Sequence, residues 1–428
     1  MSEGRMSILK MLEEKKITVD EAGKLLEAIR GLEPDAEGSE PPHTFTAKRF
    51  GGNAGPHRAG LGAFPAFPSF PDMPAPPVPP APPAPLAQPA PVPTPMPAPF
   101  AVMPHMHRAD LSGADLNGAN LAHKDLSGAN LSHAVLCEAD LQGTNLAGAN
   151  LEGTDLSHAN LQHANLTQAN LRGAILQESN LQGAVLVNAS VEGADLSSAD
   201  LTEATLTHAG LRSVLMQEAT LARAVLTQSN LSGTDLSSAD LTDADLTASD
   251  LRSTQLCEAT LCRASLNNAN MIGADLRSAD LTDADLAQAK LTSAQLSEAD
   301  LTRANLSNVI AEGADLRSAD LTDANLQNAN MRSAQLQEAT LVRAAMTNAV
   351  LADADLNSAN LSEADLTNAD LRSAQLQEAT LQRAHLVNAV LDEANLHSAD
   401  LNEANLQGTK LDGAQLEDTE LSDMEDLD

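Results

Sequence analysis

The chain has 428 residues, a formal net charge of −34 and no Trp or Tyr, and all six Phe lie within its first hundred residues. A layered globular domain of this size normally builds its core around aromatic side chains, which bury the most area per residue. The composition therefore argues against such a domain and for a repeat architecture. The negative charge argues against nucleic acid as a direct partner and favours a protein partner that is basic or binds DNA.

Cysteine usage and the N-terminal sequence bear on the cellular compartment. Cys137, Cys257 and Cys262 form no CxxC pair, and the N-terminal sequence holds no apolar run of signal-peptide or transmembrane length. Stable disulfides belong to oxidising compartments. We therefore expect a cytoplasmic protein without membrane insertion.

The first segment, residues 1–31, is predicted to form an α-helical hairpin. Apolar residues between positions 6 and 31 recur at helical spacing, Thr18 and Glu21 form a capping box, and Gly31 suits a helix end. The stretch resembles the SHOCT-like module found in bacterial multidomain proteins. Two such helices bury little alone, so we expect recruitment or self-association through residues 6–31; a merely solubilising hairpin is the alternative.

The second segment, residues 32–104, is predicted to be a disordered proline-rich linker. Eighteen of the 22 prolines fall between Pro65 and Pro104, a density that favours the polyproline II conformation. The sequence FPAFPSFP (Phe64 to Pro71) is a docking motif or, as for most such segments, a spacer.

The third segment, residues 105–428, repeats every five residues. From Leu111 to Leu421 there are 63 consecutive pentads, with Leu at nearly every centre and Ala two residues before it in most. A period of five fits neither an α-helix nor a continuous strand. Each pentad is therefore predicted to be a short extended piece followed by a two-residue corner.

A longer period gives the number of sides. Blocks that begin at Leu211, Leu251, Leu291, Met331 and Leu371 nearly repeat one another, which is a superperiod of 40 residues. A 20-residue coil of four pentads divides 40, whereas coils of three or five pentads do not. The pattern A(D/N)LXX resembles the pentapeptide-repeat family, and this resemblance implies an all-β solenoid, a right-handed quadrilateral β-helix of about 16 coils followed by an acidic C-terminal tail.

Arranged in 20-residue coils, one column alternates in charge. Stacked coils lie about 4.8 Å apart, like paired strands, so opposite charges in neighbouring coils attract. We expect Arg303 to contact both Asp283 and Asp323, one coil away on either side, and the column to fix the register. This charge ladder consists of Glu203, Arg223, Asp243, Arg263, Asp283, Arg303, Asp323, Arg343, Glu363, Arg383 and Glu403.

The four sides differ in charge. Sorted by side, residues 109–423 carry net charges of −3, −14, −10 and −3. The nearly neutral side with centres Leu226, Leu266 and Leu306 is a candidate interaction face. Its outer column contains Asn268, Asn308, Asn328, Asn348, Asn368 and Asn388.

No catalytic constellation or cofactor site is predicted, because Ser and Asp recur only as repeat residues at outward positions. Several histidines lie near the start of the repeats. We interpret them as separate, solvent-facing residues and not as a metal site. They are His105, His107, His123, His133, His158 and His163.

The sequence thus predicts a non-catalytic protein-interaction rod or scaffold, tethered to the N-terminal hairpin. The alternative follows from the family resemblance, since quinolone-resistance members mimic DNA and bind DNA gyrase. Residues 108–428 carry a net charge of −32. Over a rod of about 75 Å this is about one charge per 2.3 Å, against about 1.7 Å in duplex DNA.

Overall fold

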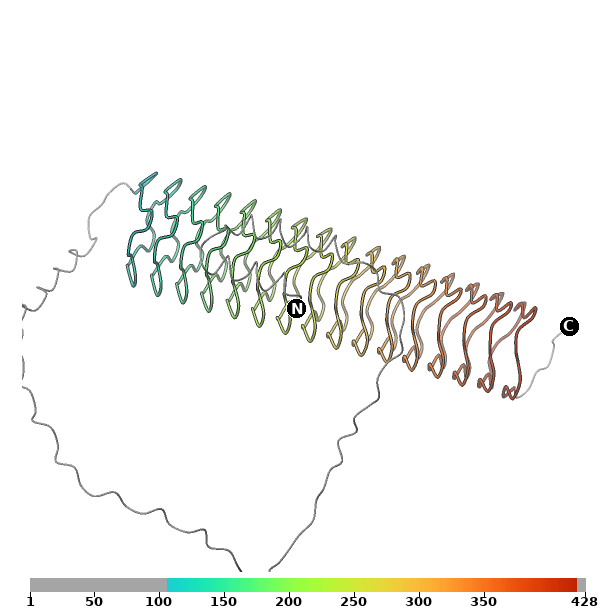
Figure 1. Cartoon of the computed structure of the whole chain (residues 1–428). Coiled ribbons are helices and arrows are strands. Elements are labelled where there is room, and N and C mark those ends of the chain that lie inside the picture. The colour runs from blue at the N-terminus through green and yellow to red at the C-terminus, as the bar shows by residue number, and fades with distance from the viewer. Residues whose placement is uncertain (1–105, 422–428) are drawn as a thin grey trace, which may run out of the picture. The chain divides into compact units, whose positions relative to one another are not determined.

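The computed structural model describes residues 106–421, which form a rod of stacked, equivalent coils (Figure 1). The predicted helical hairpin (1–31), the linker (32–104) and the end of the acidic tail lie outside the described residues. Within 106–421 the backbone contains no helix and no continuous strand; its regular elements are single-residue parallel bridges at every fifth position. No helix in this part of the chain is long and apolar enough to cross a membrane.

The bridges define the coil. Every bridge joins a residue to the one 20 positions later, from Asp110↔Asn130 to Asp400↔Glu420. Bridge positions recur every five residues, so a coil of 20 residues contains four of them and has four sides. The 20-residue coil predicted from the 40-residue superperiod is confirmed.

The preference for Asp or Asn before each centre follows from the backbone donors, as the pentad that begins at Asn130 illustrates. The amides of Leu131 and His133 donate to the next coil at 2.7 and 2.9 Å, and that of Asn130 donates to the previous coil at 2.9 Å. The amide of Ala134 closes a turn onto the Leu131 carbonyl at 3.0 Å. The remaining amide, of Ser132, donates to the side-chain Oδ1 of Asn130 at 3.3 Å. An Asp or Asn side chain thus accepts a hydrogen bond from the one amide of the pentad that has no backbone acceptor.

The core consists of the centre residues and the alanines two positions before them. Leu281 and Leu286 are fully buried, and Ala284 is 1% exposed. Where Thr replaces Ala, its hydroxyl is satisfied: Thr144 Oγ1 donates to the Leu121 carbonyl at 2.8 Å. The alanines are small enough to let the four walls approach, which explains a core built without aromatic rings.

The corner residue two positions after each centre has a left-handed backbone. Non-glycine residues there have φ between 54° and 62°. None of them is Val, Ile or Thr, since a β-branched side chain at positive φ is strained. The position therefore selects its residues by backbone conformation as well as by charge.

This restriction gives a first prediction. Replacing Ser318 (φ 55°) by Val should lower the free energy of unfolding by about 1–3 kcal/mol, because Val must adopt the left-handed conformation. Ser318→Asn, which this conformation tolerates, is the control and should leave stability nearly unchanged. Chemical denaturation of both variants measures the difference, and equal stabilities would contradict the explanation.

Candidate interaction surfaces

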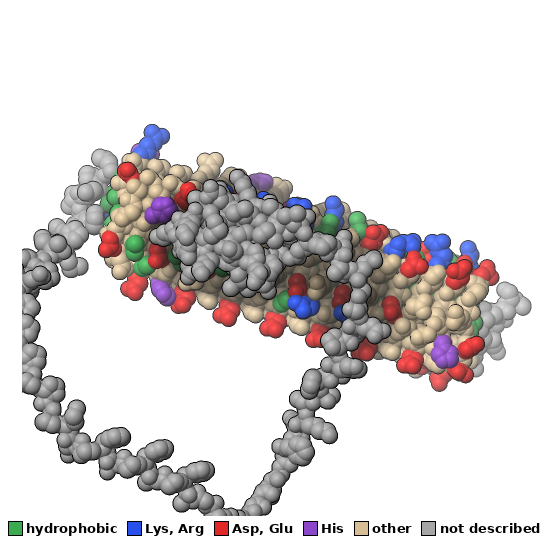
Figure 2. All heavy atoms as spheres, viewed as in Figure 1, with side chains coloured by type: hydrophobic (Ala, Val, Ile, Leu, Met, Phe, Trp, Pro, Cys, Tyr) green, Lys and Arg blue, Asp and Glu red, His purple; other side chains and the backbone are tan. Residues whose placement is uncertain are grey.

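The four sides of the rod are named here by their centres. The mixed-charge face has centres at position 111 and every twentieth residue to 411, and the first acidic face at 116 to 416. The second acidic face has centres at 121 to 421, and the asparagine face at 126 to 406. In Figure 2, Asp and Glu side chains lie along the whole visible length of the rod, with Lys and Arg side chains among them.

The charge ladder lies on the corner that follows the second acidic face. Arg303 binds Asp283 of the preceding coil through two hydrogen bonds, Nε to Oδ1 and Nη2 to Oδ2, both 2.7 Å. Arg263–Asp243 and Arg343–Asp323 repeat this geometry, and Arg223 places both nitrogens on Glu203 Oε1 at 3.1 and 2.9 Å. Each of these arginines therefore makes two hydrogen bonds to one carboxylate and joins two adjacent coils.

The expectation that Arg303 contacts both Asp283 and Asp323 was wrong. Arg303 directs Nε and Nη2 to Asp283, and the carboxylate of Asp323 is bound by Arg343 instead. Hydrogen bonds from Arg303 hold the pKa of Asp283 below its ordinary value of 3.8, and the charge of Arg263 acts in the same direction from the other side. Neighbouring pairs thus interact through space and not through contact.

The last arginine of the ladder pairs differently. Arg383 Nε lies 2.8 Å from Glu403 Oε2 in the following coil, while its Nη1 lies 3.8 Å from Glu363 Oε1. This arginine spans both neighbours, because the longer Glu side chains can reach the guanidinium from either coil.

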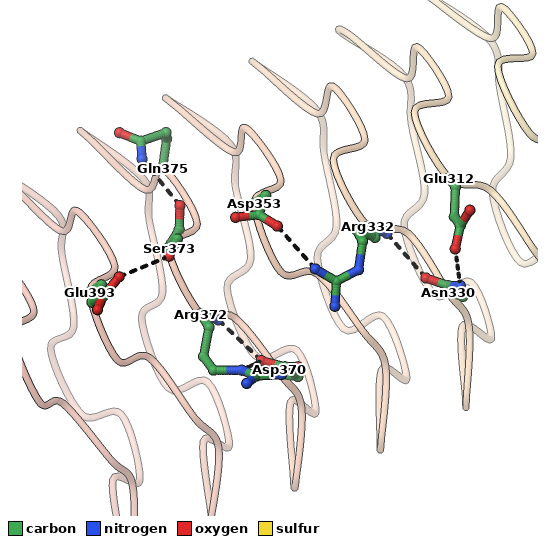
Figure 3. A network of polar contacts seen from close by, with 9 residues as sticks. All are labelled: Glu312, Asn330, Arg332, Asp353, Asp370, Arg372, Ser373, Gln375 and Glu393. Atoms are coloured by element: carbon green, nitrogen blue, oxygen red, sulfur yellow. Dashed lines mark hydrogen bonds and ion pairs between the residues drawn. The ribbon is translucent and has the colours of Figure 1, made fainter.

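A second set of ion pairs was not predicted, and Figure 3 shows one of them. Arg372 Nε and Nη2 bind the carboxylate of Asp370 in its own pentad at 2.8 and 2.6 Å. The signal in the sequence is Asp before the centre and Arg after it, which places both on one short arc. The same pattern gives the pairs Asp250–Arg252, Asp275–Arg277 and Asp315–Arg317.

Arg332 lacks this local partner because Asn330 precedes its centre. Its Nη1 crosses to Asp353 of the next coil at 3.0 Å, and Asn330 in turn binds Glu312 at 2.7 Å (Figure 3). Polar contacts therefore run continuously along this part of the mixed-charge face.

The predicted asparagine column is exposed, and part of it forms a hydrogen-bonded ladder. The Nδ2 of Asn348 donates to Oδ1 of Asn328 at 3.2 Å, Asn368 donates to Asn348 at 3.3 Å, and Asn388 donates to Asn368 at 3.4 Å. Asn268 and Asn308 lie in the same column, with Gln288 between them. Each interior amide keeps one N–H and one oxygen lone pair for another molecule.

The cysteines show no sign of nucleophilic activation. All three are free and half-buried. Burial, followed by a hydrogen bond to Asp280, raises the pKa of the Cys262 thiol to about 11, so the reactive thiolate is scarce at neutral pH. Among residues 106–421, no group of three or more His, Cys, Asp or Glu side chains is arranged to hold a metal ion.

Comparisons with known proteins agree with this geometry. A family model described as pentapeptide repeats matches overlapping segments from residue 105 to 423. A second model, described as a SHOCT-like domain, matches residues 3–33. Both resemblances drawn from the sequence are confirmed. A search of the curated proteins gave no match.

Solved structures of several repeat proteins are similar to the chain. Rfr23 from the cyanobacterium Cyanothece 51142 is 38% identical over 22% of this chain and 64% of its own, with a TM-score of 0.22. HetL, involved in heterocyst differentiation regulation in Nostoc sp. strain PCC 7120, is 33% identical over 57% of this chain and 90% of its own, with a TM-score of 0.20. QnrB1, a plasmid-mediated fluoroquinolone resistance protein, is 18% identical over 43% of this chain and 92% of its own, with a TM-score of 0.21.

Proposed function

This chain belongs to the pentapeptide-repeat family, and we propose that its β-helix is a non-catalytic, cytoplasmic interaction rod for a protein partner. The observation that carries the proposal is the separation of surface types. One face presents an exposed, uncharged amide ladder (Asn328 to Asn388), while two other faces hold most of the excess negative charge.

The asparagine face is the better contact surface on energetic grounds. Removing an unpaired carboxylate from water costs several kcal/mol, and the cores of interfaces are depleted of charged residues. An amide ladder can be covered at lower cost, because its members satisfy one another and keep groups for the partner. The acidic faces then speed the approach of a basic partner and keep the rod soluble.

The proposed organisation places this rod at residues 105–428, behind a proline-rich linker at 32–104. The match of residues 3–33 to a SHOCT-like domain supports a recruiting or self-associating role for the hairpin at 1–31. The linker would let the two modules bind separate targets.

A direct test uses isosteric changes on opposite faces. The triple variant Asn328→Asp, Asn348→Asp and Asn368→Asp adds charge to the amide ladder without changing side-chain size. We expect the immobilised variant to capture at least tenfold less of the native partner from a lysate of the organism that encodes the chain. Quantitative mass spectrometry measures the captured protein. The matched control, Glu298→Gln, Glu338→Gln and Glu378→Gln, changes the equivalent corner position of the first acidic face and should retain the partner.

Loss of the partner in the Glu→Gln variant, with capture retained in the Asn→Asp variant, would favour the second candidate. This is a DNA mimic that binds a DNA-binding enzyme such as DNA gyrase. The charge density of the rod, about one per 2.3 Å, is the observation behind it. The arginine pairs on both acidic faces count against it, because they neutralise carboxylates that a mimic needs. A mimic's partner should be displaced by duplex DNA and by salt, whereas capture through the asparagine face should resist both.

A further inference from the structure

An apolar stripe runs along the N-terminal half of the first acidic face. Val135, Ile175 and Leu215 point outward and are 38%, 40% and 43% exposed. They occupy alternate rungs of one column, and Asp155 and Asp195 occupy the rungs between them. Three large aliphatic side chains therefore stand two coils apart on the most acidic face of the rod.

The fold does not require aliphatic residues at these rungs. In the C-terminal half, the same column continues with Asp in alternate coils, but Gln replaces the aliphatic residue. The rungs concerned are Gln255, Gln295, Gln335 and Gln375. The apolar stripe is thus a local property of residues 135–215.

The acids between the aliphatic side chains are held to one side. The carboxylate of Asp195 accepts hydrogen bonds from Ser197 Oγ and Gln177 Nε2, both at 2.7 Å, and Asp155 accepts one from Ser157 Oγ at 2.7 Å. These partners lie on the corner that follows the face. The carboxylates therefore flank the aliphatic side chains with fixed negative charge.

The spacing of the stripe selects the conformation of what it binds. Neighbouring coils lie about 4.8 Å apart, so the aliphatic side chains repeat every 9.6 Å or so. A polyproline II chain repeats its side chains every three residues, about 9.3 Å. A strand repeats every 6.8 Å or so, and seven helical residues span about 10.5 Å. Over the two intervals of the stripe, the polyproline II chain drifts by only about 0.6 Å and the helix by about 1.8 Å.

Strand addition is also disfavoured at this face, because its backbone donors already bind the next coil. The amide of Leu136 donates to the Asp155 carbonyl and that of Leu176 to the Asp195 carbonyl, at 2.7 and 2.6 Å. A polyproline II ligand needs no backbone pairing and can bind through its side chains alone.

We propose that the apolar stripe of Val135, Ile175 and Leu215 binds an extended, basic peptide of a partner protein, in the polyproline II conformation and with a large apolar side chain at every third residue. Basic residues between the apolar ones meet Asp155 and Asp195. The inference rests on the proposed interaction role but not on the asparagine face, so the two can fail separately.

The test measures the affinity of the full-length chain for synthetic peptides by fluorescence anisotropy. The probe is a labelled nonapeptide of three Phe-Pro-Arg repeats, and its comparator has the same composition with the phenylalanines four residues apart. We expect the probe to bind at least tenfold more tightly. Raising the salt concentration should weaken both peptides but preserve the preference for three-residue spacing.

Two variants locate the site. The triple variant Val135→Gln, Ile175→Gln and Leu215→Gln introduces the residue that the same column uses further along, so its melting temperature should match the parent's. It should lose at least tenfold in affinity for the probe. Its control changes Ile310, Val350 and Val390 to Gln, on the mixed-charge face, where apolar residues recur at the same two-coil spacing.

The control variant should bind like the parent, because the rungs between its apolar residues hold the uncharged Asn330 and Asp370, whose carboxylate is paired with Arg372. Equal binding of the two peptides, unchanged affinity in the stripe variant, or loss only in the control would each overturn the proposal. Binding of the probe with loss in the stripe variant would support it even where the asparagine variant still captures its partner.

Discussion

A variant in which Arg223, Arg263, Arg303, Arg343 and Arg383 are all changed to Glu is expected to melt well below the parent at low ionic strength. The change removes bidentate pairs such as Arg303–Asp283, with contacts of 2.7 Å. It also stacks carboxylates in successive coils about 4.8 Å apart, where like charges repel. Thermal unfolding followed by circular dichroism measures the loss.

The salt dependence separates the electrostatic effect from other damage. At about 1 M salt the screening length is only 3 Å or so, so the melting temperature of the reversed variant should return most of the way to the parent's. Changing the same five arginines to Gln removes the pairs without adding repulsion and should give an intermediate loss. If the reversed variant melts like the parent at low salt, the alternating column reflects duplication history alone.

Acid titration gives a second readout of the same ladder. Hydrogen bonds from arginine lower the pKa of Asp243, Asp283 and Asp323 from 3.8. A lowered pKa in the folded state stabilises the fold above the unfolded pKa, and this contribution is lost as the pH falls through the folded value. The parent should therefore lose stability below about pH 3.8. In the reversed variant the added glutamates become neutral in the same pH range. The difference in stability between the parent and the reversed variant should therefore shrink on acidification.

The sequence was sufficient to predict the coil because the superperiod records contacts between coils. Arg303 and Asp283 are 20 positions apart in a column whose charges alternate in sign from coil to coil. This long-range pattern identified which residues are neighbours before any geometry was known. The bridges confirm that spacing throughout.

Which neighbour a side chain contacts could not be predicted in the same way. A column places Arg303 equally far along the axis from Asp283 and Asp323, so the sequence does not say which acid it binds. Arg303 binds the acid of the preceding coil, whereas Arg383 in the same column binds that of the following coil. The pairs of the type Asp370–Arg372 were missed for a related reason. Asp370 lies in the extended piece of the pentad and Arg372 lies in the corner that follows it. The direction of a corner side chain is known only from the backbone, which brings the two side chains together.

The apolar stripe illustrates a third limit. Val135, Ile175 and Leu215 stand out only when they are compared with the glutamines that follow in the same column. In the linear sequence, each is one aliphatic residue among many leucines and alanines. Its outward direction and exposure follow from the pentad geometry and are visible only once the coil is built.

The interior should respond more strongly than any surface pair. Replacing the fully buried Leu286 by Ala is expected to lower the free energy of unfolding by about 3–5 kcal/mol, through lost apolar burial and the cavity left between stacked coils. Leu286→Met is the matched control, since Met fills centres 216, 271, 331 and 346 of the same rod, and it should cost less than about 1.5 kcal/mol.

The position of the damage is as informative as its size. In a solenoid each coil contacts only its neighbours, so stability is nearly a sum of local contributions. Hydrogen exchange of Leu286→Ala should therefore be faster by roughly a hundredfold or more in the coils around residue 286, as local opening becomes easier. Coils near residues 130 and 390 should exchange as in the parent. A uniform increase along the rod would mean that the β-helix opens as a single cooperative unit, and the picture of independent neighbouring coils would have to be abandoned.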